Sequence, residues 1–273
     1  MPGSVTMKLM RSLQAVGIEP YVIYSSGRGL KKYRENRKAF LAQAGDDPLW
    51  PLGDAYPCLS DRYDVSGVAK GQYFHQDLLV AQQIHAAKPE RHVDVGSRVD
   101  GFVAHVAAFM PIEVVDIRPL TTTAENITFT QRDLMIADPE FDDYTDSLSC
   151  LHTLEHFGLG RYGDPVDYDG YRKGFDNLAR MVRPGGTFYL SVPISRRQRI
   201  EFDAHRLFEV PHVVELVEDQ FDIKTAAIVN DAEDVVRDVD VRSAEGHRSF
   251  DVEYGCIMLD LRKRHERSAT TPS

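Results

Sequence analysis

The sequence has few cysteines and no long run of apolar residues. Its three cysteines, Cys58, Cys150 and Cys256, lie far apart and form no CxxC pair. An odd, scattered set is typical of reduced thiols in the cytoplasm rather than of a secreted disulfide framework. No stretch approaches the roughly 18 apolar residues of a membrane-spanning helix, and the N-terminus has no apolar signal region. We therefore expect a soluble, cytoplasmic protein.

An excess of positive charge is also lacking. The 32 Lys and Arg residues stand against 42 Asp and Glu residues, which gives a formal net charge of -10. A diffuse acidic surface repels nucleic-acid phosphates and anionic lipid head groups, so neither nucleic acid nor a membrane is an expected partner. The 273 residues, 42% of them apolar, suffice to bury a core without disulfides or a metal. The oligomeric state stays open, with a homodimer as one option.

The first part of the chain, residues 1–88, has an irregular pattern. Helices are expected at residues 31–44 and 74–87, and three prolines and a glycine break the segment 46–57 between them. The apolar face expected on the second helix consists of Phe74, Leu78, Ala81 and Ile84. We expect residues 1–88 to form a helical appendage packed on a core domain.

The expected core domain, residues 89–261, begins with alternating strands and helices. Strands are expected at residues 92–95, 112–116, 127–129, 147–151 and 187–192, and a helix at 166–182. Short apolar strands that alternate with helices predict a parallel sheet covered on both faces.

The pattern changes after the fifth expected strand. A helix at residues 211–220 precedes two long strands, 221–229 and 250–261, which an acidic loop, residues 231–245, joins. The whole predicts a doubly wound α/β fold with a mainly parallel, seven-stranded sheet and a terminal antiparallel strand pair. Polar residues 262–273 are expected to form a mobile tail, and the first seven residues are also polar.

The loop after the first strand contains Asp94-Val-Gly96-Ser97-Arg98-Val-Asp-Gly101. Ligands of open α/β sheets bind beyond the carboxyl ends of the strands. Gly96 allows a sharp turn close to a ligand, and Gly101 lets the next helix pack closely. Asp94 can orient the loop or meet an ammonium group. Glycine turns after strands are common, so this loop alone is a weak signal.

Two further acids strengthen it. Asp116 ends the second strand, 22 residues after Asp94, where a carboxylate can accept both hydroxyl hydrogens of a ribose. Its alternative role is to cap the next turn. Beyond the third strand, Asp133 can bond an adenine amino group and Leu134 can cover the ring, although a lone acid there is more often a surface residue.

The fourth strand ends in the cluster His152-Thr-Leu-Glu155-His156. It matches the H-x-x-E-H zinc-peptidase signature, which needs a long helix and a third ligand. Gly158 and Gly160 interrupt any such helix, so no metal is expected and a zinc hydrolase is the weaker alternative. A general base at the carboxyl edge of the sheet fits better, and histidines bonded to the backbone remain a third option.

Together these features resemble the class I S-adenosylmethionine-dependent methyltransferases. The resemblance rests on Val93-Asp94-Val-Gly96 with Gly101, on Asp116, on Leu154-Glu155-His156, and on Leu178-Ala-Arg-Met-Val-Arg183-Pro184-Gly185-Gly186 before the fifth strand. Three segments look more closely like an uncharacterised methyltransferase-like domain-of-unknown-function family. They are Tyr73-Phe-His-Gln76-Asp77, Asp94-Val-Gly-Ser-Arg98-Val-Asp-Gly-Phe102 and Gly158-Leu-Gly-Arg161-Tyr-Gly-Asp164-Pro165. Some of its members are associated with glycan biosynthesis.

The resemblance implies S-adenosylmethionine as cofactor and O-methylation of a sugar or glycan-related small molecule. The cofactor-binding residues it implies are Asp94, Gly96, Ser97, Arg98, Gly101, Asp116, Ile117, Asp133, Leu134, Leu151, His152 and Tyr73. For an acceptor hydroxyl, His156 is the expected base and Glu155 or Asp164 would orient it. His205, past the fifth strand, is the alternative base or else forms a helix-entry hydrogen bond.

The glycine loop departs from the family pattern G-x-G-x-G, since Arg98 and Asp100 replace the second and third glycines. Arg98 would pair with the cofactor carboxylate, or fill the site and leave an inactive scaffold that binds a partner through residues 46–57. A nicotinamide-dependent enzyme would instead need a G-x-G-x-x-G loop, which is absent.

Overall fold

The computed structural model describes residue 13 and residues 17–44 and 51–265. Residues 1–7 and 46–50, and all of the tail beyond residue 265, which enter the expectations above, lie outside the described residues. The chain divides into two compact units, Met1–Val68 and Ala69–Ser273. The segment from residue 69 to 88, expected in the N-terminal appendage, therefore belongs to the same unit as the sheet.

In the first unit, a long helix contacts a segment that follows it in the sequence. Helix α2, Pro20–Ala44, begins earlier than the predicted residue 31, and the short 3-10 helix η1 spans Asp61–Tyr63. A Cβ atom added to Gly29 would lie 1.9 Å from the carbonyl oxygen of Leu59, so only glycine admits this crossing. Tyr21 donates from its hydroxyl to the carbonyl of Tyr63 at 3.4 Å.

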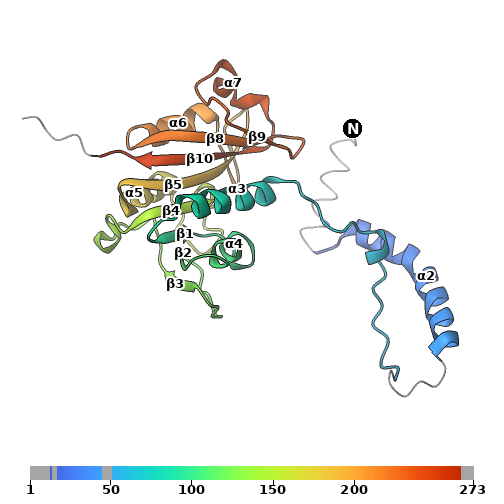
Figure 1. Cartoon of the computed structure of the whole chain (residues 1–273). Coiled ribbons are helices and arrows are strands. Elements are labelled where there is room, and N and C mark those ends of the chain that lie inside the picture. Colours follow the sequence, from blue (N-terminus) through green and yellow to red (C-terminus); the bar gives the residue numbers. More distant parts are fainter. Residues whose placement is uncertain (1–12, 14–16, 45–50, 266–273) are drawn as a thin grey trace, which may run out of the picture. The chain divides into compact units, whose positions relative to one another are not determined.

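The second unit is built on one eight-stranded sheet, with the order β3-β2-β1-β4-β5-β10-β8-β9 (Figure 1). The strands that pair in parallel are β1 His92–Val95, β2 Ile112–Asp116, β3 Ile127–Gln131, β4 Thr145–Leu151 and β5 Val182–Ile194. Those that pair antiparallel beyond β5 are β10 Gly255–Lys263, β8 Phe221–Val229 and β9 Val235–Arg237. The predicted doubly wound, mainly parallel sheet with a terminal antiparallel pair is confirmed. The short strand β9, inside the expected acidic loop, adds an eighth strand.

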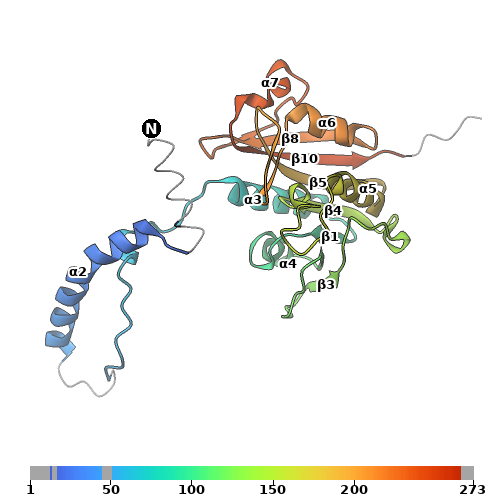
Figure 2. The same ribbon diagram turned by 180° about the vertical axis from the view of Figure 1, so that it is seen from behind.

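Helices cover both faces of this sheet (Figure 2). The helices of this unit are α3 Gln72–Ala87, α4 Ala104–Ala107, α5 Gly170–Met181, α6 Val210–Glu218 and α7 Ala244–His247. Phe175 and Leu178 of α5 share the largest buried cluster with Phe188 of β5, whereas Val80 and Ile84 of α3 lie in a second cluster. Strands β1 and β4 are buried although polar residues alternate with apolar ones in both. The polar side chains are satisfied across the two strands, because His92 bonds Ser147 and Ser149, and Ser149 donates to Asp94.

The predicted face of α3 is wrong in part. Ala81 and Ile84 are buried, but Phe74 is 42% exposed and Leu78 is 38% exposed. The helix instead buries Leu79 in a third cluster with strands β8 and β10, so two clusters rather than one set its orientation.

Other boundaries also differ from the prediction. Strand β10 starts at Gly255, because residues 249–251 form a 3-10 turn with three positive φ angles, and it continues to Lys263 into the expected tail. A small separate sheet pairs β6, Arg199–Glu201, with β7, His205–Leu207. Within the described ranges, no helix has the length and apolar content that crossing a bilayer requires.

Candidate functional site

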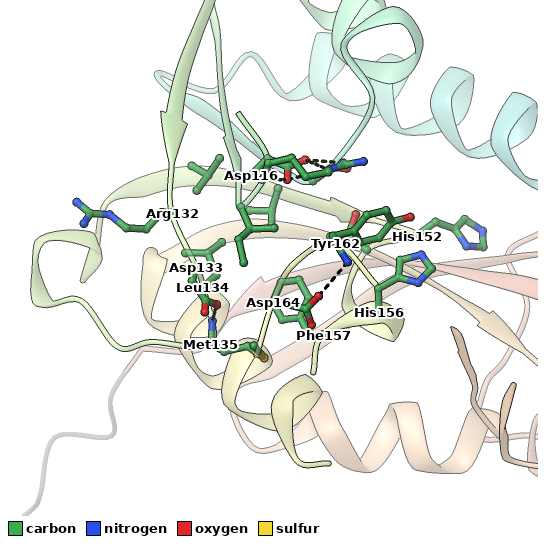
Figure 3. A pocket seen from close by; sticks show the side chains of 16 residues that line it. Asp116, Arg132, Asp133, Leu134, Met135, His152, His156, Phe157, Tyr162 and Asp164 are labelled. Carbon is green, nitrogen blue, oxygen red and sulfur yellow. Dashed lines mark hydrogen bonds and ion pairs between the residues drawn. The ribbon is translucent and has the colours of Figure 1, made fainter. Parts of the chain in front are cut away.

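A pocket that is partly open to solvent lies at the carboxyl ends of β1, β2 and β4. This is where the strand order reverses around β1, the position at which open α/β sheets bind ligands. Its lining consists of Val95, Gly96, Val115, Asp116, Ile117, Arg118, Arg132, Asp133, Leu134, Met135, His152, Thr153, His156, Phe157, Tyr162 and Asp164. Figure 3 shows Asp133 and Leu134 towards one end and His152 and His156 towards the other, with Tyr162 between them.

Gly96 turns the chain into the pocket. Its φ of 75° is in the left-handed region, and an added Cβ would lie 2.3 Å from Cγ2 of Thr153. The turn therefore requires glycine both for its backbone conformation and for its close approach to the loop after β4.

Asp94 holds this loop from inside the protein. Its buried carboxylate accepts hydrogen bonds from the Ser149 hydroxyl at 2.5 Å, the Ser97 hydroxyl at 3.0 Å and the Ser97 amide at 3.1 Å. Burial raises the pKa of Asp94 to about 7, against the lowering effect of these hydrogen bonds. Asp94 does not line the pocket, so of its two expected roles the geometry supports orienting the loop.

Asp116 lines the pocket but is already paired. The guanidinium of Arg118 donates to its two oxygens, with Nη2 at 2.5 Å from Oδ2 and Nε at 3.1 Å from Oδ1. Arg118 also donates to the carbonyl of Gly96 at 3.3 Å and lies 4.5 Å from the ring centre of Tyr162. Sequence reasoning missed Arg118 and Tyr162. Only the position of Arg118, two residues after Asp116, was a signal.

The loop that carries Tyr162 is organised by Asp164. The Asp164 carboxylate accepts from the amides of Gly158 at 2.8 Å, Gly160 at 3.1 Å and Tyr162 at 3.1 Å. Asp164 therefore shapes this wall of the pocket, and the expectation that it orients His156 is not supported by its contacts.

At the opposite end, Asp133 accepts from the amide of Met135 at 2.9 Å and closes its own turn. Leu134, only 6% exposed, lines the pocket beside it. Ile117 also lines the pocket as expected.

Several expected cofactor residues lie outside the pocket lining. Arg98 extends into solvent and pairs with Asp100, with Nη2 and Oδ2 2.6 Å apart, so it does not fill the pocket. Gly101 faces α3, where an added Cβ would lie 3.4 Å from Oδ2 of Asp77. Leu151 is buried in the second cluster, and Ser97 bonds Asp94.

His152 and Glu155 form a buried pair. His152 follows β4 with a φ of 49°, and its Nδ1 lies 3.0 Å from Oε1 of Glu155. Burial alone would lower the pKa of His152, but Cys256 and Glu155 raise it to about 10. The ring of Tyr73 lies 5.0 Å from the ring of His152, outside the pocket lining.

His156 has the geometry of a neutral base. Its Nδ1 donates to the carbonyl of Ala204 at 2.8 Å, so in the neutral ring Nε2 carries the lone pair. Burial lowers the pKa of His156, partly offset by Glu155, whose Oε1 lies 3.8 Å from Nε2. His205 lies outside the pocket lining, stacked on Tyr254 with ring centres 5.6 Å apart.

The zinc alternative is not supported by this arrangement. Glu155 and His156 lie on a three-residue 3-10 helix, η4 Leu154–His156, while His152 precedes it. A long helix with both imidazoles on one face is therefore missing. Among the described residues, no group of three or more His, Cys, Asp and Glu side chains has an arrangement that could hold a metal.

Solved structures resemble this chain in fold. SpnF, a [4+2]-cyclase, has a TM-score of 0.50 and 14% identity, over 70% of this chain and 81% of its own. The 1,6-didemethyltoxoflavin-N1-methyltransferase of Burkholderia thailandensis, solved with 1,6-didemethyltoxoflavin and S-adenosylhomocysteine, has a TM-score of 0.48 and 17% identity, over 70% of this chain and 79% of its own. The N-methyltransferase NodS of Bradyrhizobium japonicum WM9, solved with S-adenosylhomocysteine, has a TM-score of 0.47 and 11% identity, over 71% of this chain and 89% of its own. At such identities, likeness concerns the fold alone.

The strand order of the sheet thus defines a Rossmann-like α/β fold, which the chain shares with SpnF. Residues 113–259 match the family described as "Caenorhabditis protein of unknown function, DUF268", and the chain belongs to that family. The expectation of an uncharacterised domain-of-unknown-function branch is confirmed. No curated protein sequence matches the chain.

Proposed function

We propose that this protein is an S-adenosylmethionine-dependent methyltransferase. The observation that carries the proposal is the single pocket in which Gly96, Asp116 and Leu134 meet the His152–His156 segment. An adenosyl group with a charged tail requires three features of a site. They are a glycine that lets the backbone approach the ligand closely, a carboxylate placed to bind the ribose hydroxyls, and an apolar side chain that covers the adenine ring.

The residues present fit such a cofactor, with one rearrangement. Asp116 would bond the ribose hydroxyls, Leu134 would cover the adenine, and Gly96 would leave room for the amino-acid part. Arg118 must then release the Asp116 carboxylate, which is feasible because its side chain is 41% exposed. Arg98 points away, so the unusual glycine loop does not obstruct the pocket.

When bound, the cofactor would supply a sulfonium methyl group to the acceptor oxygen. The electron pair of the sulfur–methyl bond would stay on sulfur, which gives S-adenosylhomocysteine. The protein must hold the acceptor oxygen in line and remove its proton. His156 Nε2 suits that proton, because Nδ1 is fixed on Ala204. We propose a sugar or glycan-related hydroxyl as the acceptor, and the cytoplasm as the location.

Calorimetry with S-adenosylmethionine, S-adenosylhomocysteine and NAD tests the cofactor. We expect micromolar-range binding of the first two and none of NAD. Asp116→Ala should weaken binding by roughly 1.5–3 kcal/mol, the scale of a charge-assisted hydrogen bond. Equal affinities of the wild type and this variant, or binding of NAD alone, would contradict the proposal.

A second candidate is a cofactor-binding scaffold without methyl transfer. The observation in its favour is that Arg118 already binds both carboxylate oxygens of Asp116, so a ligand must displace this ion pair. Transfer of a labelled methyl group to sugars and sugar nucleotides separates the two: cofactor binding with no labelled product from any acceptor favours the scaffold.

A further inference from the structure

The first unit has no apolar core in its described part, residues 13, 17–44 and 51–68. No apolar side chain is buried there, and Ser25 and Gly29 are the only buried residues. Of the 22 large apolar side chains that are exposed in the described chain, 11 belong to this unit. Exposed apolar side chains in such numbers indicate a surface that binds a partner.

Helix α2, the main element of this unit, differs in charge from the whole chain. It contains six Lys and Arg residues and one acid, Glu35, whereas the chain has a formal net charge of -10. Glu35 pairs with Lys32 at 3.4 Å. The expectation that a membrane is not a partner rests on the net charge of the whole chain, and α2 is a local exception to that charge.

Three basic side chains of α2 lie on one face of the helix. Lys31, Arg34 and Lys38 follow each other at spacings of three and four residues, which places them along one side at 3.6 residues per turn. All three are exposed, and none forms an ion pair with a described residue. Gly29 marks the opposite side of the helix, because it contacts the backbone of Leu59. The basic side chains therefore point away from this contact.

Two apolar side chains extend this face towards the start of the helix. Tyr24 precedes Lys31 by seven residues and Ile23 precedes Arg34 by eleven, which are close to two and three full turns. Tyr24 is 62% exposed and Ile23 is 64% exposed. Apolar groups beside long basic side chains suit the surface of a membrane, where the charged ends reach phosphates while the apolar parts lie deeper.

We propose that this face of α2, formed by Ile23, Tyr24, Lys31, Arg34 and Lys38, docks on a membrane surface that contains anionic phospholipids. The basic side chains meet the phosphate-bearing head groups. Ile23 and Tyr24 enter the boundary between head groups and acyl chains. The inference goes beyond the proposed function, because it concerns where the protein binds and not what it modifies.

Two other occupants of this face fit less well. A nucleic acid would neutralise the basic side chains through its phosphates, but contact with its charged backbone would leave the aliphatic side chain of Ile23 in water. The same face of a second copy would bring like charges together, which is unfavourable.

The test measures binding of the full chain to lipid vesicles by sedimentation. The vesicles consist of phosphatidylcholine alone, or of phosphatidylcholine with phosphatidylserine, at salt concentrations of roughly 0.1 M and 1 M. The variant of the basic face is Lys31→Gln/Arg34→Gln/Lys38→Gln. Because these side chains are exposed and have no ion pair with a described residue, the variant should fold, and thermal unfolding checks this.

The matched control removes the same charge from the second unit. It is Arg242→Gln/Arg248→Gln/Arg264→Gln, at three exposed side chains that each pair with an exposed acid. Ile23→Ser tests the apolar part of the face separately. A fluorescent single-stranded RNA is added as a second ligand, in order to separate a membrane from a nucleic acid.

We expect the wild type to sediment with the anionic vesicles but not with the neutral ones, and more weakly at the higher salt concentration. Each basic side chain near an anionic surface strengthens binding about fivefold, so the variant of the basic face should bind about 100-fold more weakly. The control should bind within about twofold of the wild type. Ile23→Ser should bind about fivefold more weakly, from the loss of buried apolar area.

Three results would overturn the proposal. The first is that the wild type binds neither kind of vesicle, or binds both equally. The second is that the control loses as much binding as the variant of the basic face. The third is that RNA binds tightly through the basic face while vesicles do not, which would make α2 a contact for nucleic acid.

Discussion

Arg118 holds both carboxylate oxygens of Asp116 at the end of β2, with its guanidinium lying over the ring of Tyr162. Asp116 is thereby joined to the loop after β4, although the two segments are far apart in the sequence. The acid expected to bind a ribose thus has a competing partner in the protein itself. Ligand binding and the release of Arg118 should be coupled.

The first prediction concerns this competition. Arg118→Met keeps an unbranched stem beside Tyr162 but removes the guanidinium. This frees Oδ2 of Asp116, while Oδ1 still accepts from the backbone amide of residue 118 at 2.8 Å. An ion pair with this degree of exposure is worth roughly 0–1 kcal/mol, so S-adenosylhomocysteine should bind up to about fivefold more tightly. Calorimetry checks this, with Arg98→Met, on an exposed pair outside the pocket, as a control expected to show no change. Weaker binding in Arg118→Met would mean that the guanidinium contacts the ligand instead.

The second prediction concerns His156. If its Nε2 accepts the acceptor's proton, His156→Ala should lower turnover by roughly 10²–10⁴-fold and leave cofactor affinity nearly unchanged. Only the neutral ring is a base, so wild-type turnover should rise with pH and level off. Because burial lowers the pKa of His156, that rise should lie below the ordinary value of 6.5.

His205→Ala is the matched comparison for this variant, since His205 lies outside the pocket lining. His205→Ala should lower turnover less than His156→Ala does, and its turnover should still rise with pH as in the wild type. Full turnover in His156→Ala together with loss in His205→Ala would transfer the role of base to His205.

The third prediction separates strain from steric contact at two glycines. Gly96 and Gly163 have φ angles of 75° and 86°, but an added Cβ meets Thr153 at 2.3 Å only at Gly96 and meets nothing within 4 Å at Gly163. Gly163→Ala should cost roughly 1–2 kcal/mol of unfolding free energy, from its backbone conformation alone. Gly96→Ala should cost more and also weaken cofactor binding. Denaturant unfolding and calorimetry of both variants measure the difference, and equal effects would rule out the role given to Thr153.

The fourth prediction concerns Arg206, which is buried and holds the segment after β4. It donates to the carbonyls of Phe157 at 2.6 Å, Tyr168 at 3.1 Å and Glu155 at 3.2 Å. Arg206→Met would remove the side-chain donor from these three carbonyls, of which that of Glu155 is in a buried contact, at a cost of about 1–3 kcal/mol in unfolding free energy.

The control for this variant is Arg199→Met on the neighbouring strand β6. Arg199 is 40% exposed in its side chain, and its loss should change the unfolding free energy by no more than about 0.5 kcal/mol. Unfolding in denaturant, with unchanged slope, is the measurement. A similar small change in both variants would show that the segment after β4 does not depend on Arg206.

Three strands of the sheet were predicted with the correct bounds. The bounds of β1, β2 and β8 agree with the predicted ranges, because each has β-branched residues between turn residues, a composition that favours strands. The three-residue strands β6, β7 and β9 were not predicted, since segments so short carry no periodicity and form only when a neighbouring strand is present.

The sequence by itself determined the alternation of strands and helices, the glycine at position 96 and the acid at the end of β2, because each depends on local conformation. Tertiary structure alone decided that Arg118 occupies Asp116, that Asp164 shapes a loop rather than orienting His156, and that His156 is fixed on Ala204. The contacts of Arg118 and Asp164 are local in sequence, but they form only in the loop conformations that the packed sheet imposes. The contact of His156 with Ala204 joins residues far apart in the sequence, so no local pattern encodes it.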